Sequence, residues 1–288
     1  MSKPILVLDS QEIDNYGLCP FRGHAIHNLN LLPRDPNAIF ERGGLLHDFL
    51  EKYYTLKRDT FKGHQDIVEE VVEFGRVKAL EYITVEPQEV TDTIFQFREY
   101  ARYYENEFWT PIFIEQSFIK EFYEDSEIKI MLAGKPDLYF KYTGTNHFAV
   151  TDHKRMSRAV NYSSLRNQNI LYATAMQTDT VIINKVGFQK TLKPKDRFVR
   201  QTFTYRPEIL NEWRLDTIQL AKEILIWNET GRFRRERTSC EKFNGCFLHN
   251  YCTTRPEARE FLIGGEYIVG KPWDVTKRLE GLEGETEQ

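Results

Sequence analysis

Two aspartates and one lysine near the middle of the chain have the types and spacing for metal-assisted chemistry. Asp152 and Lys154 are two residues apart in a strand-like run, so their side chains share one face of that strand. Asp137 lies at the start of the neighbouring strand-like run and can reach the same face. Mg²⁺ is usually bound through one or two carboxylates, and a bound divalent ion activates water and stabilises charge on a phosphoryl group. With the positive charge of the lysine added, the trio predicts hydrolysis of a phosphodiester bond.

A β-hairpin and a helix are expected to position these residues. Residues 138–142 and 147–154 predict two strands around a glycine-containing turn. Residues 163–176 favour a helix, which either of its two leading serines can cap. Gln168 and Tyr172 are four positions apart on that helix, so they form a pair on one helix face.

These motifs carry a resemblance to a known family. Pro136-Asp137, followed by Asp152-His153-Lys154 and then by Gln168-x-x-x-Tyr172, resembles the signature of the PD-(D/E)XK nuclease superfamily. The third motif is similar to that of the RecB-like branch, which includes nuclease domains of recombination helicases and CRISPR-adaptation nucleases. The resemblance implies a restriction-endonuclease-like core of order αβββαβ. The expected fold is therefore α/β, with a small mixed sheet of about four strands, flanking helices and a helical insertion.

The resemblance also implies roles for the motif residues. Asp137 and Asp152 would bind Mg²⁺ or Mn²⁺, with the backbone carbonyl of His153 as a further ligand. Lys154 would position the attacking water and stabilise the charged transition state. Gln168 and Tyr172 would help to hold DNA or the catalytic lysine.

Two more candidate ligands precede these motifs. His47 lies on a predicted amphipathic helix over residues 40–54, where the resemblance places a metal-binding histidine; the alternative is a structural histidine. An imidazole ligand shifts the metal preference toward Mn²⁺. Glu115 lies inside the apolar run 111–119, which predicts the first core strand. A carboxylate there is costly unless it is paired or near a metal, so Glu115 is expected to support a ligand or to bind a second ion.

Helices account for much of the remaining sequence. Residues 64–109 contain two amphipathic stripes, the second capped by Thr91 or Asp92, and predict a helical insertion at about 60–110. An N-terminal helix is expected to begin near Gln11, after a cap at Asp9 or Ser10, and to end before Pro20. The tyrosines of the insertion could stack on bases, but a stripe at helical spacing favours a core role. A single domain is expected over residues 1–275, with an acidic tail at 276–288.

Basic residues gather in the second half of the chain, although the net charge of the whole chain is −4. Between Lys185 and Arg237 there are 13 lysines and arginines and 7 acidic residues. A local basic patch can bind phosphates even when the net charge is negative; a solvated charged surface is the alternative for any one residue. The candidate DNA-binding residues are Arg155, Arg158, Arg166, Lys193, Lys195 and Arg197.

The four cysteines lie in two flanks, at residues 9–30 and 238–255. One cysteine before the nuclease motifs and three after them resembles the iron–sulfur subset of RecB-like nucleases, which implies a [4Fe–4S] cluster on four thiolates. The first interval of the C-terminal triplet has five residues where that subset usually has two. Zinc on Cys246-x-x-His249-x-x-Cys252 is the runner-up, and four free thiols are the third possibility. The expected cluster ligands are Cys19, Cys240, Cys246 and Cys252.

The function expected from these features is metal-dependent DNA hydrolysis, with exonuclease action on single strands or duplex ends. Recombination, repair, phage DNA processing and CRISPR adaptation would each use such an enzyme, with a recombination or integration protein as a partner. No apolar run approaches the ~20 residues of a membrane span, so a cytoplasmic location in a bacterium, an archaeon or a phage-infected host is expected. A restriction-type endonuclease is a second reading, which the Gln168/Tyr172 pair and the cysteines disfavour. A third interpretation is a non-catalytic DNA-binding subunit on a nuclease scaffold. Such a subunit would be expected to have an incomplete set of metal-binding residues.

Overall fold

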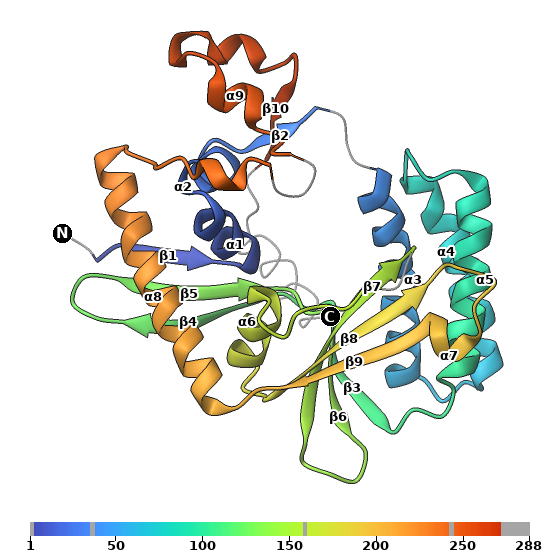
Figure 1. Cartoon of the computed structure of the whole chain (residues 1–288). Helices are drawn as coiled ribbons and strands as arrows, with labels where there is room; N and C mark the ends of the chain where they lie inside the picture. Colours follow the sequence, from blue (N-terminus) through green and yellow to red (C-terminus); the bar gives the residue numbers. More distant parts are fainter. Residues whose placement is uncertain (1–2, 35–37, 158–159, 242–244, 272–288) are drawn as a thin grey trace, which may run out of the picture. The chain divides into compact units, whose positions relative to one another are not determined.

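The computed structural model describes residues 3–34, 38–157, 160–241 and 245–271. It is a mixed α/β structure, as expected, and it divides into two compact units (Figure 1). One unit, here called the five-stranded unit, comprises residues 37–116 and 135–207. The other, here called the cysteine unit, comprises residues 1–36, 117–134 and 208–288. The expected acidic tail at 276–288 lies outside the described residues.

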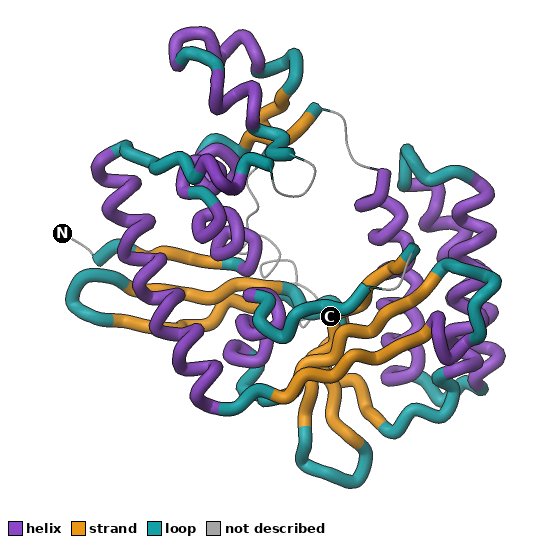
Figure 2. The backbone as a smooth tube through the Cα atoms, in the orientation of Figure 1, coloured by secondary structure: helices purple, strands orange, loops and turns teal. Residues whose placement is uncertain are grey.

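A mixed five-stranded sheet is the centre of the first unit (Figure 2). Its strand order is β3-β6-β7-β8-β9, one strand more than expected. The predicted hairpin is confirmed as β6 and β7, with Leu138 opposite Thr151 and Lys141 opposite Phe148. β7 and β8 are parallel, and the other neighbours are antiparallel. The strands are β3 (Trp109–Ile114), β6 (Leu138–Tyr142), β7 (Phe148–Met156), β8 (Thr180–Gly187) and β9 (Phe198–Thr204).

α3 (Ala38–Asp59) and α5 (Pro87–Tyr103) pack on one face of this sheet, and α4 (His64–Lys78) packs against these two helices. A Cβ atom at Gly75 would lie 1.9 Å from the Phe49 ring, so only glycine allows α3 and α4 this close. The expected cap of α5 at Thr91 or Asp92 is wrong, because the helix begins with a proline after a capping box formed by Glu86 and Glu89. The shared core includes Leu46, Phe49, Tyr53, Val71, Phe97, Tyr100, Phe140, Ala149, Ile182, Val186 and Phe198.

The opposite face carries α6 (Asn167–Ala175), and α7 (Pro194–Arg197) is a short turn before β9. The helix begins later than expected: its N-cap is Arg166 rather than a serine, and no side chain caps it. Since side chains alternate along a strand, Asp152, Lys154 and Met156 share this face of β7. A hydrogen bond from Gln168 on α6 to Asp152 confirms the assignment.

The expected single strand over 111–119 is wrong. The chain leaves β3 after Ile114 and begins β4 (Phe118–Glu124) in the cysteine unit, because Glu115 has a left-handed backbone with φ of 49°. Such a conformation cannot continue a strand. β4 pairs with β5 (Lys129–Gly134), and β5 pairs in parallel with β1 (Ile5–Leu8). Neither β1 nor β5 follows from the patterns described above.

The rest of the cysteine unit joins the two ends of the described chain. The two-stranded ribbon β2–β10 pairs Leu31 with Val269. The predicted N-terminal helix is confirmed as α1, which Asp9 caps. The other elements of this unit are α1 (Ser10–Leu18), α2 (Pro20–Gly23), a π-helical turn (His24–Asn28), β2 (Leu31–Pro33), α8 (Pro207–Thr230), α9 (His249–Thr253), β10 (Tyr267–Val269), and 3₁₀ turns at Arg237–Ser239 and Pro256–Leu262. The five-stranded unit has a 3₁₀ turn at Ala79–Glu81.

None of the helices in these ranges is both long enough and apolar enough to span a lipid bilayer.

Glu12 makes the stability of the cysteine unit sensitive to pH. Burial and the nearby negative charge of Asp9 raise the Glu12 pKa to about 8, although a hydrogen bond from the Asp9 amide acts to lower it. The folded state therefore prefers the neutral acid. The contribution of Glu12 to the free energy of unfolding is fully present below its unfolded pKa of ~4.3, and it is lost as the pH rises through its folded pKa. We predict that Glu12→Gln, which keeps the acceptor of the capping box, melts a few degrees above the parent at about pH 9 and level with it at about pH 4.

Glu229→Gln is the matched control, because Glu229 is exposed on α8. Thermal melts of the three proteins across this pH range test the prediction. An equal Tm for the parent and Glu12→Gln at alkaline pH would contradict it.

Candidate active site

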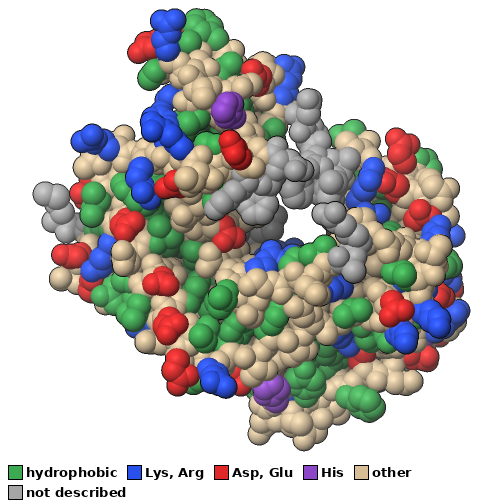
Figure 3. All heavy atoms as spheres, viewed as in Figure 1, with side chains coloured by type: hydrophobic (Ala, Val, Ile, Leu, Met, Phe, Trp, Pro, Cys, Tyr) green, Lys and Arg blue, Asp and Glu red, His purple; other side chains and the backbone are tan. Residues whose placement is uncertain are grey.

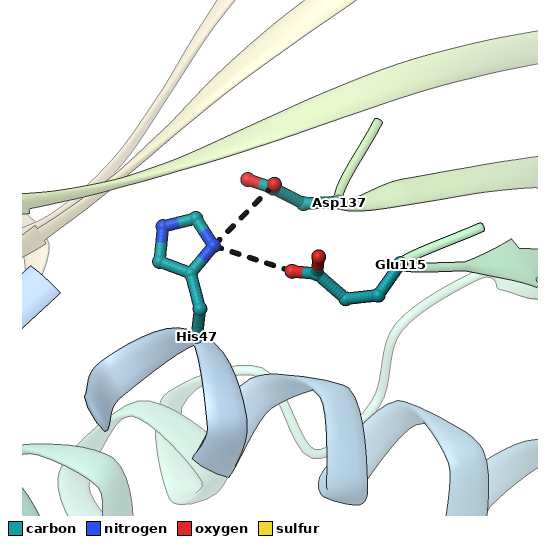
Figure 4. A group of neighbouring side chains, drawn as sticks. All are labelled: His47, Glu115 and Asp137. Atoms are coloured by element: carbon teal, nitrogen blue, oxygen red, sulfur yellow. Dashed lines mark hydrogen bonds and ion pairs between the residues drawn. The ribbon is translucent and has the colours of Figure 1, made fainter. Parts of the chain in front are cut away.

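Three side chains from separate elements converge into one potential ligand set (Figure 4). His47 on α3 places Nδ1 3.2 Å from Glu115 Oε1 and 3.4 Å from Asp137 Oδ1. One ligand atom from each residue lies within 4.8 Å of the others. An imidazole nitrogen and two carboxylates suit a divalent ion such as Mn²⁺. The structure thus brings both of the early candidates, His47 and Glu115, to Asp137.

The left-handed backbone of Glu115 turns its side chain toward this set. The Glu115 amide donates a hydrogen bond to the Asp137 carbonyl oxygen at 3.0 Å, which ties the end of β3 to the residue before β6. A non-glycine residue in this conformation costs about 1–3 kcal/mol, and such residues concentrate at functional sites. The strain supports a role for the carboxylate of Glu115 beyond packing.

Lys135 is a member of the site that the motif search does not identify. Its Nζ lies 2.6 Å from Glu115 Oε2, on the side of the carboxylate opposite His47. The Tyr172 hydroxyl donates to the Lys135 carbonyl oxygen at 3.0 Å. The only available sequence signal was position, since Lys135 lies between the glycine and the proline of the Gly134-Lys135-Pro136-Asp137 stretch.

Asp152, Lys154 and Gln168 form a second group beside the first. Asp152 is 2% exposed, and its Oδ1 accepts hydrogen bonds from Lys154 Nζ at 2.8 Å and from Gln168 Nε2 at 3.1 Å. Its Oδ2 is buried and has no hydrogen-bond partner among the described residues. A buried carboxylate oxygen needs a partner, and a metal ion supplies one. Asp152 is not part of the compact set of His47, Glu115 and Asp137.

A backbone hydrogen bond links the two groups. The amide of His153, between Asp152 and Lys154 on β7, donates to Asp137 Oδ2. The His153 ring points to the helical face of the sheet, where its Nδ1 lies 2.8 Å from Asn184 Nδ2 and its ring stacks on Tyr54. The aspartate before β6 is therefore anchored to the strand that carries the other two motif residues. The expectation that the His153 carbonyl binds metal is untested.

Burial and ion pairing shift the protonation of these groups in opposite directions. Burial alone would lower the His47 pKa, but the charge of Asp137 and hydrogen bonds to Asp137 and Glu115 raise it well above its usual value. Burial would raise the Asp137 pKa, but the charge and hydrogen bond of His47 hold it below the usual range. Burial raises the Asp152 pKa, against the opposing charge of Lys154. A proton on His47 thus occupies the place where a divalent cation would balance the same carboxylates.

The expected DNA-binding residues have different environments. The structure corrects the expectation for Arg197. This residue is 5% exposed and donates to Gln96 and Glu99, so it is a structural residue. Lys193 and Lys195 are exposed, and Arg158 lies outside the described residues. Arg155 stacks on Phe188 and Arg166 on Tyr162, with ring-centre distances of 3.8 and 4.8 Å. On the face drawn in Figure 3, acidic and basic side chains of the described residues are intermingled.

The four cysteines lie in one region of the cysteine unit. Cys246 and Cys252 pack against the apolar cluster that contains Cys19, and the Cys246 amide donates to the Cys240 carbonyl oxygen. Burial and the charges of the other three thiolates raise the Cys240 pKa. Among the described residues, no three cysteine sulfurs lie within 4.8 Å of one another. Tetrahedral zinc needs sulfurs ~3.8 Å apart, given a Zn–S bond of ~2.3 Å, so a zinc set is not preformed.

N–H groups point at three of these sulfurs. Cys252 Sγ lies 3.2 Å from Arg235 Nε, and Cys19 Sγ lies 3.3 Å from the Glu236 amide. Cys246 Sγ lies 3.9 Å from Arg22 Nη1. Sulfur is a weak hydrogen-bond acceptor, and in the other direction Cys19 Sγ and Cys240 Sγ lie 3.9 Å from the carbonyl oxygens of Arg234 and Glu236.

The comparisons with known proteins are distant. No protein-family model matches the sequence, and no curated protein does. Among solved structures, a "putative exonuclease" from Eubacterium rectale is 10% identical, with 94% of this chain and 92% of that chain covered and a TM-score of 0.47. SSO0001 is 13% identical, covering 67% and 90%, with a TM-score of 0.32. LHK-Exo in complex with dAMP is 12% identical, covering 65% and 97%, with a TM-score of 0.30. All three identities are below 25% and all three TM-scores are below 0.5, so these similarities establish neither a family nor a function for this chain.

Ion binding at this site is directly measurable. A ligand at ~100 times its Kd stabilises the folded state by about 2.7 kcal/mol, which raises the Tm of a protein of this size by roughly 5–10 °C. We predict such a rise with Mn²⁺ over chelator for the parent and its loss in Asp137→Asn. Glu105→Gln, an exposed acid of the same unit, should respond like the parent. An equal Mn²⁺ response in Asp137→Asn would remove Asp137 from the ligand set.

Proposed function

We propose that this protein is a metal-dependent DNA nuclease of the RecB-like PD-(D/E)XK type, acting as an exonuclease on single strands or duplex ends. One observation carries the proposal: His47, Glu115 and Asp137 converge beside the Asp152–Lys154 pair. Every residue of the motif set is present, and the carboxylates are buried or half-buried. A scaffold that had lost catalysis would have no reason to keep this collection of costly charges.

The roles follow from the positions of the side chains. His47, Glu115, Asp137 and the unpartnered Oδ2 of Asp152 would hold one or two divalent ions. Such an ion supplies water activation and charge stabilisation on the phosphoryl group. Lys154, held on Asp152, would position the attacking water and place a positive charge next to the reacting phosphate. Gln168 donates to the same Asp152 oxygen as Lys154 and helps to hold it in place.

DNA as the substrate rests on the family resemblance and on local cations. Arg166 beside Gln168, and the exposed Lys193 and Lys195, are candidates to contact the phosphate backbone. A non-catalytic DNA-binding subunit is the main alternative, and a restriction-type endonuclease is the other. They differ from the proposal in whether DNA is cut and in whether a free end is needed.

We also propose that Cys19, Cys240, Cys246 and Cys252 hold a [4Fe–4S] cluster with a structural role. Four cysteines are the usual donor set, and the N–H groups directed at three of the sulfurs support thiolate ligands. A cubane cluster also separates its ligands more widely than a single zinc ion does. The cluster would join the N-terminal helices to the segment from Cys240 to α9, which contains Cys252.

Cleavage requires the two charged residues that share β7. We predict that Asp152→Ala and Lys154→Ala each lower the cleavage rate on the order of 10²–10³-fold or more. Asp152→Ala removes a candidate ligand of the ion, and Lys154→Ala removes the positive charge beside the reacting phosphate. The assay uses end-labelled single- and double-stranded DNA with Mg²⁺, Mn²⁺ or chelator. A circular single strand in parallel separates exonuclease from endonuclease action.

Lys62→Ala removes an exposed lysine from the same unit and should cleave at the parental rate. Thermal melts confirm that the variants are folded. A folded Asp152→Ala protein with full activity would overturn the site assignment. Binding without cleavage by the parent, with either ion, would favour the non-catalytic subunit.

The cluster proposal has its own test. Anaerobically purified parent should be brown and contain about four irons per chain, and Cys19→Ser should lose the colour and melt at a lower temperature. His249→Ala is the discriminating control, because it removes a zinc ligand of the runner-up site but no cluster ligand. The cluster would be refuted if the parent contains stoichiometric zinc that His249→Ala loses. It would also be refuted if the parent is colourless and Cys19→Ser leaves the Tm unchanged.

A further inference from the structure

A second lysine lies beside Lys154 in the sheet. β7 and β8 are parallel, and their register pairs Lys154 with Lys185. β8 and β9 pair Lys185 with Val199. Paired residues of neighbouring strands point to the same face, and the strands are ~4.8 Å apart. Lys154, Lys185 and Val199 therefore form one row across the face that carries Asp152.

This row leads into a cavity of about 120 Å³. The volume exceeds the ~10–15 Å³ needed by one water molecule and is below the ~300 Å³ at which pockets for drug-sized ligands begin. One planar ring system is a ligand of suitable size. Met156, Leu192 and Val199 supply apolar walls, Gly187 leaves space, and Lys185 and Asn161 supply polar groups; Asp196 and Arg197 also line the cavity.

Lys185 is an unusual lining residue because it is buried and weakly partnered. It is 7% exposed, and the one hydrogen bond of its ammonium group within the described ranges is a 3.5 Å contact with Asn161 Oδ1. No acidic group of the described residues forms an ion pair with it, although a buried ammonium is costly without one. A group kept at such a cost, in a cavity next to a candidate active site, indicates an anionic ligand.

Tyr162 connects the cavity with the site. Its ring has the Arg166 guanidinium at 4.8 Å and the Lys185 ammonium at 5.7 Å from the ring centre. Two hydrogen bonds between the Tyr162 backbone and the Gln201 side chain hold it over the sheet. Arg166 in turn donates to Gln168, which contacts Asp152. Positive charges thus continue from the reacting centre to the cavity, as a path for successive phosphates requires.

We propose that this cavity is a nucleotide subsite, which receives the base of a nucleotide next to the scissile bond while Lys185 binds the phosphate of that nucleotide. The assignment rests on the proposed nuclease function, because it takes the bound strand to be DNA. Apolar walls with a few polar groups accept any base, so the subsite would hold the strand without strong sequence preference. Its role is to retain the strand next to Lys154.

Two substitutions test the subsite by different means. Lys185→Met removes the ammonium and keeps an unbranched apolar side chain, and Val199→Trp fills the cavity. Thr202→Trp is the matched control, because Thr202 is exposed on the opposite face of the same strand. The probes are dAMP, dTMP and inorganic phosphate, titrated calorimetrically onto the full chain in chelator, so that no metal and no hydrolysis is involved.

We expect the parent and Thr202→Trp to bind both nucleotides, and Lys185→Met and Val199→Trp to raise the Kd at least tenfold. Lys185→Met should melt at or above the parental Tm, since it removes a buried charge. The proposal is overturned if the parent binds no nucleotide, or if neither substitution weakens nucleotide binding. It is also overturned if Lys185→Met lowers the Tm while Val199→Trp binds nucleotides as tightly as the parent does. The last result would make Lys185 a structural residue.

The same variants separate this inference from the nuclease proposal. If the parent cleaves DNA with Mn²⁺ but nucleotide binding is insensitive to both substitutions, the subsite is wrong and the nuclease proposal is unaffected. If nucleotides bind through Lys185 but the parent cleaves no DNA with any ion, the cavity binds nucleotides and the nuclease proposal fails.

Discussion

Repulsion between carboxylates is the constraint on which the five-stranded unit depends. Glu115, Asp137 and Asp152 are brought together where water is scarce, and like charges in such surroundings oppose folding. Each has a cation in contact: Lys135 on Glu115, His47 on Asp137 and Lys154 on Asp152. The hairpin, the bend at Glu115 and the position of α3 all serve to maintain this pairing. These cations neutralise the carboxylates when no metal is bound. A divalent ion can replace the proton of His47 or the ammonium group of a lysine beside the same carboxylates.

The two faces of β7 have different roles: one carries the candidate catalytic side chains, and the other packs in the core. Asp152 and Lys154 point to one face, and His153 points to the other, where Tyr54 and Asn184 hold its ring. Burial lowers the His153 pKa to about 3, so its ring is neutral within the core. A slip of one residue in the pairing with β8 would exchange these faces. The parallel pairing with β8, with its apolar β-branched residues, therefore specifies the site as much as the catalytic residues do.

The parts of the structure that local patterns determine could be predicted from the sequence. The hairpin, the helix of His47 and the N-terminal helix follow from periodicity and turn residues. What failed depends on context. Glu115 ends a strand inside an apolar run, because tertiary contacts stabilise a conformation that the residue itself disfavours. Arg197 looks like a surface cation in the sequence, but Gln96 and Glu99, almost a hundred residues away, bury it. Lys135 and Lys185 belong to no recognised motif. Their positions beside the candidate site depend on the pairing of strands that are distant in the sequence.

The order of the chain segments has a consequence for how the protein is made. The cysteine unit takes its strands from residues 1–36 and 117–134, but its long helix, three of its cysteines and the strand that pairs with β2 come after residue 207. A ribosome releases the whole five-stranded unit before these last elements emerge. Because domains fold as units during synthesis, the five-stranded unit can fold while β4, whose Phe122 ring contacts Trp213 of α8, still lacks that helix. A chaperone would therefore be needed while the cysteine unit is incomplete. A chain truncated after β9 would keep the pairing of β1 with β5 but would lack α8, three cysteines and the partner strand of β2.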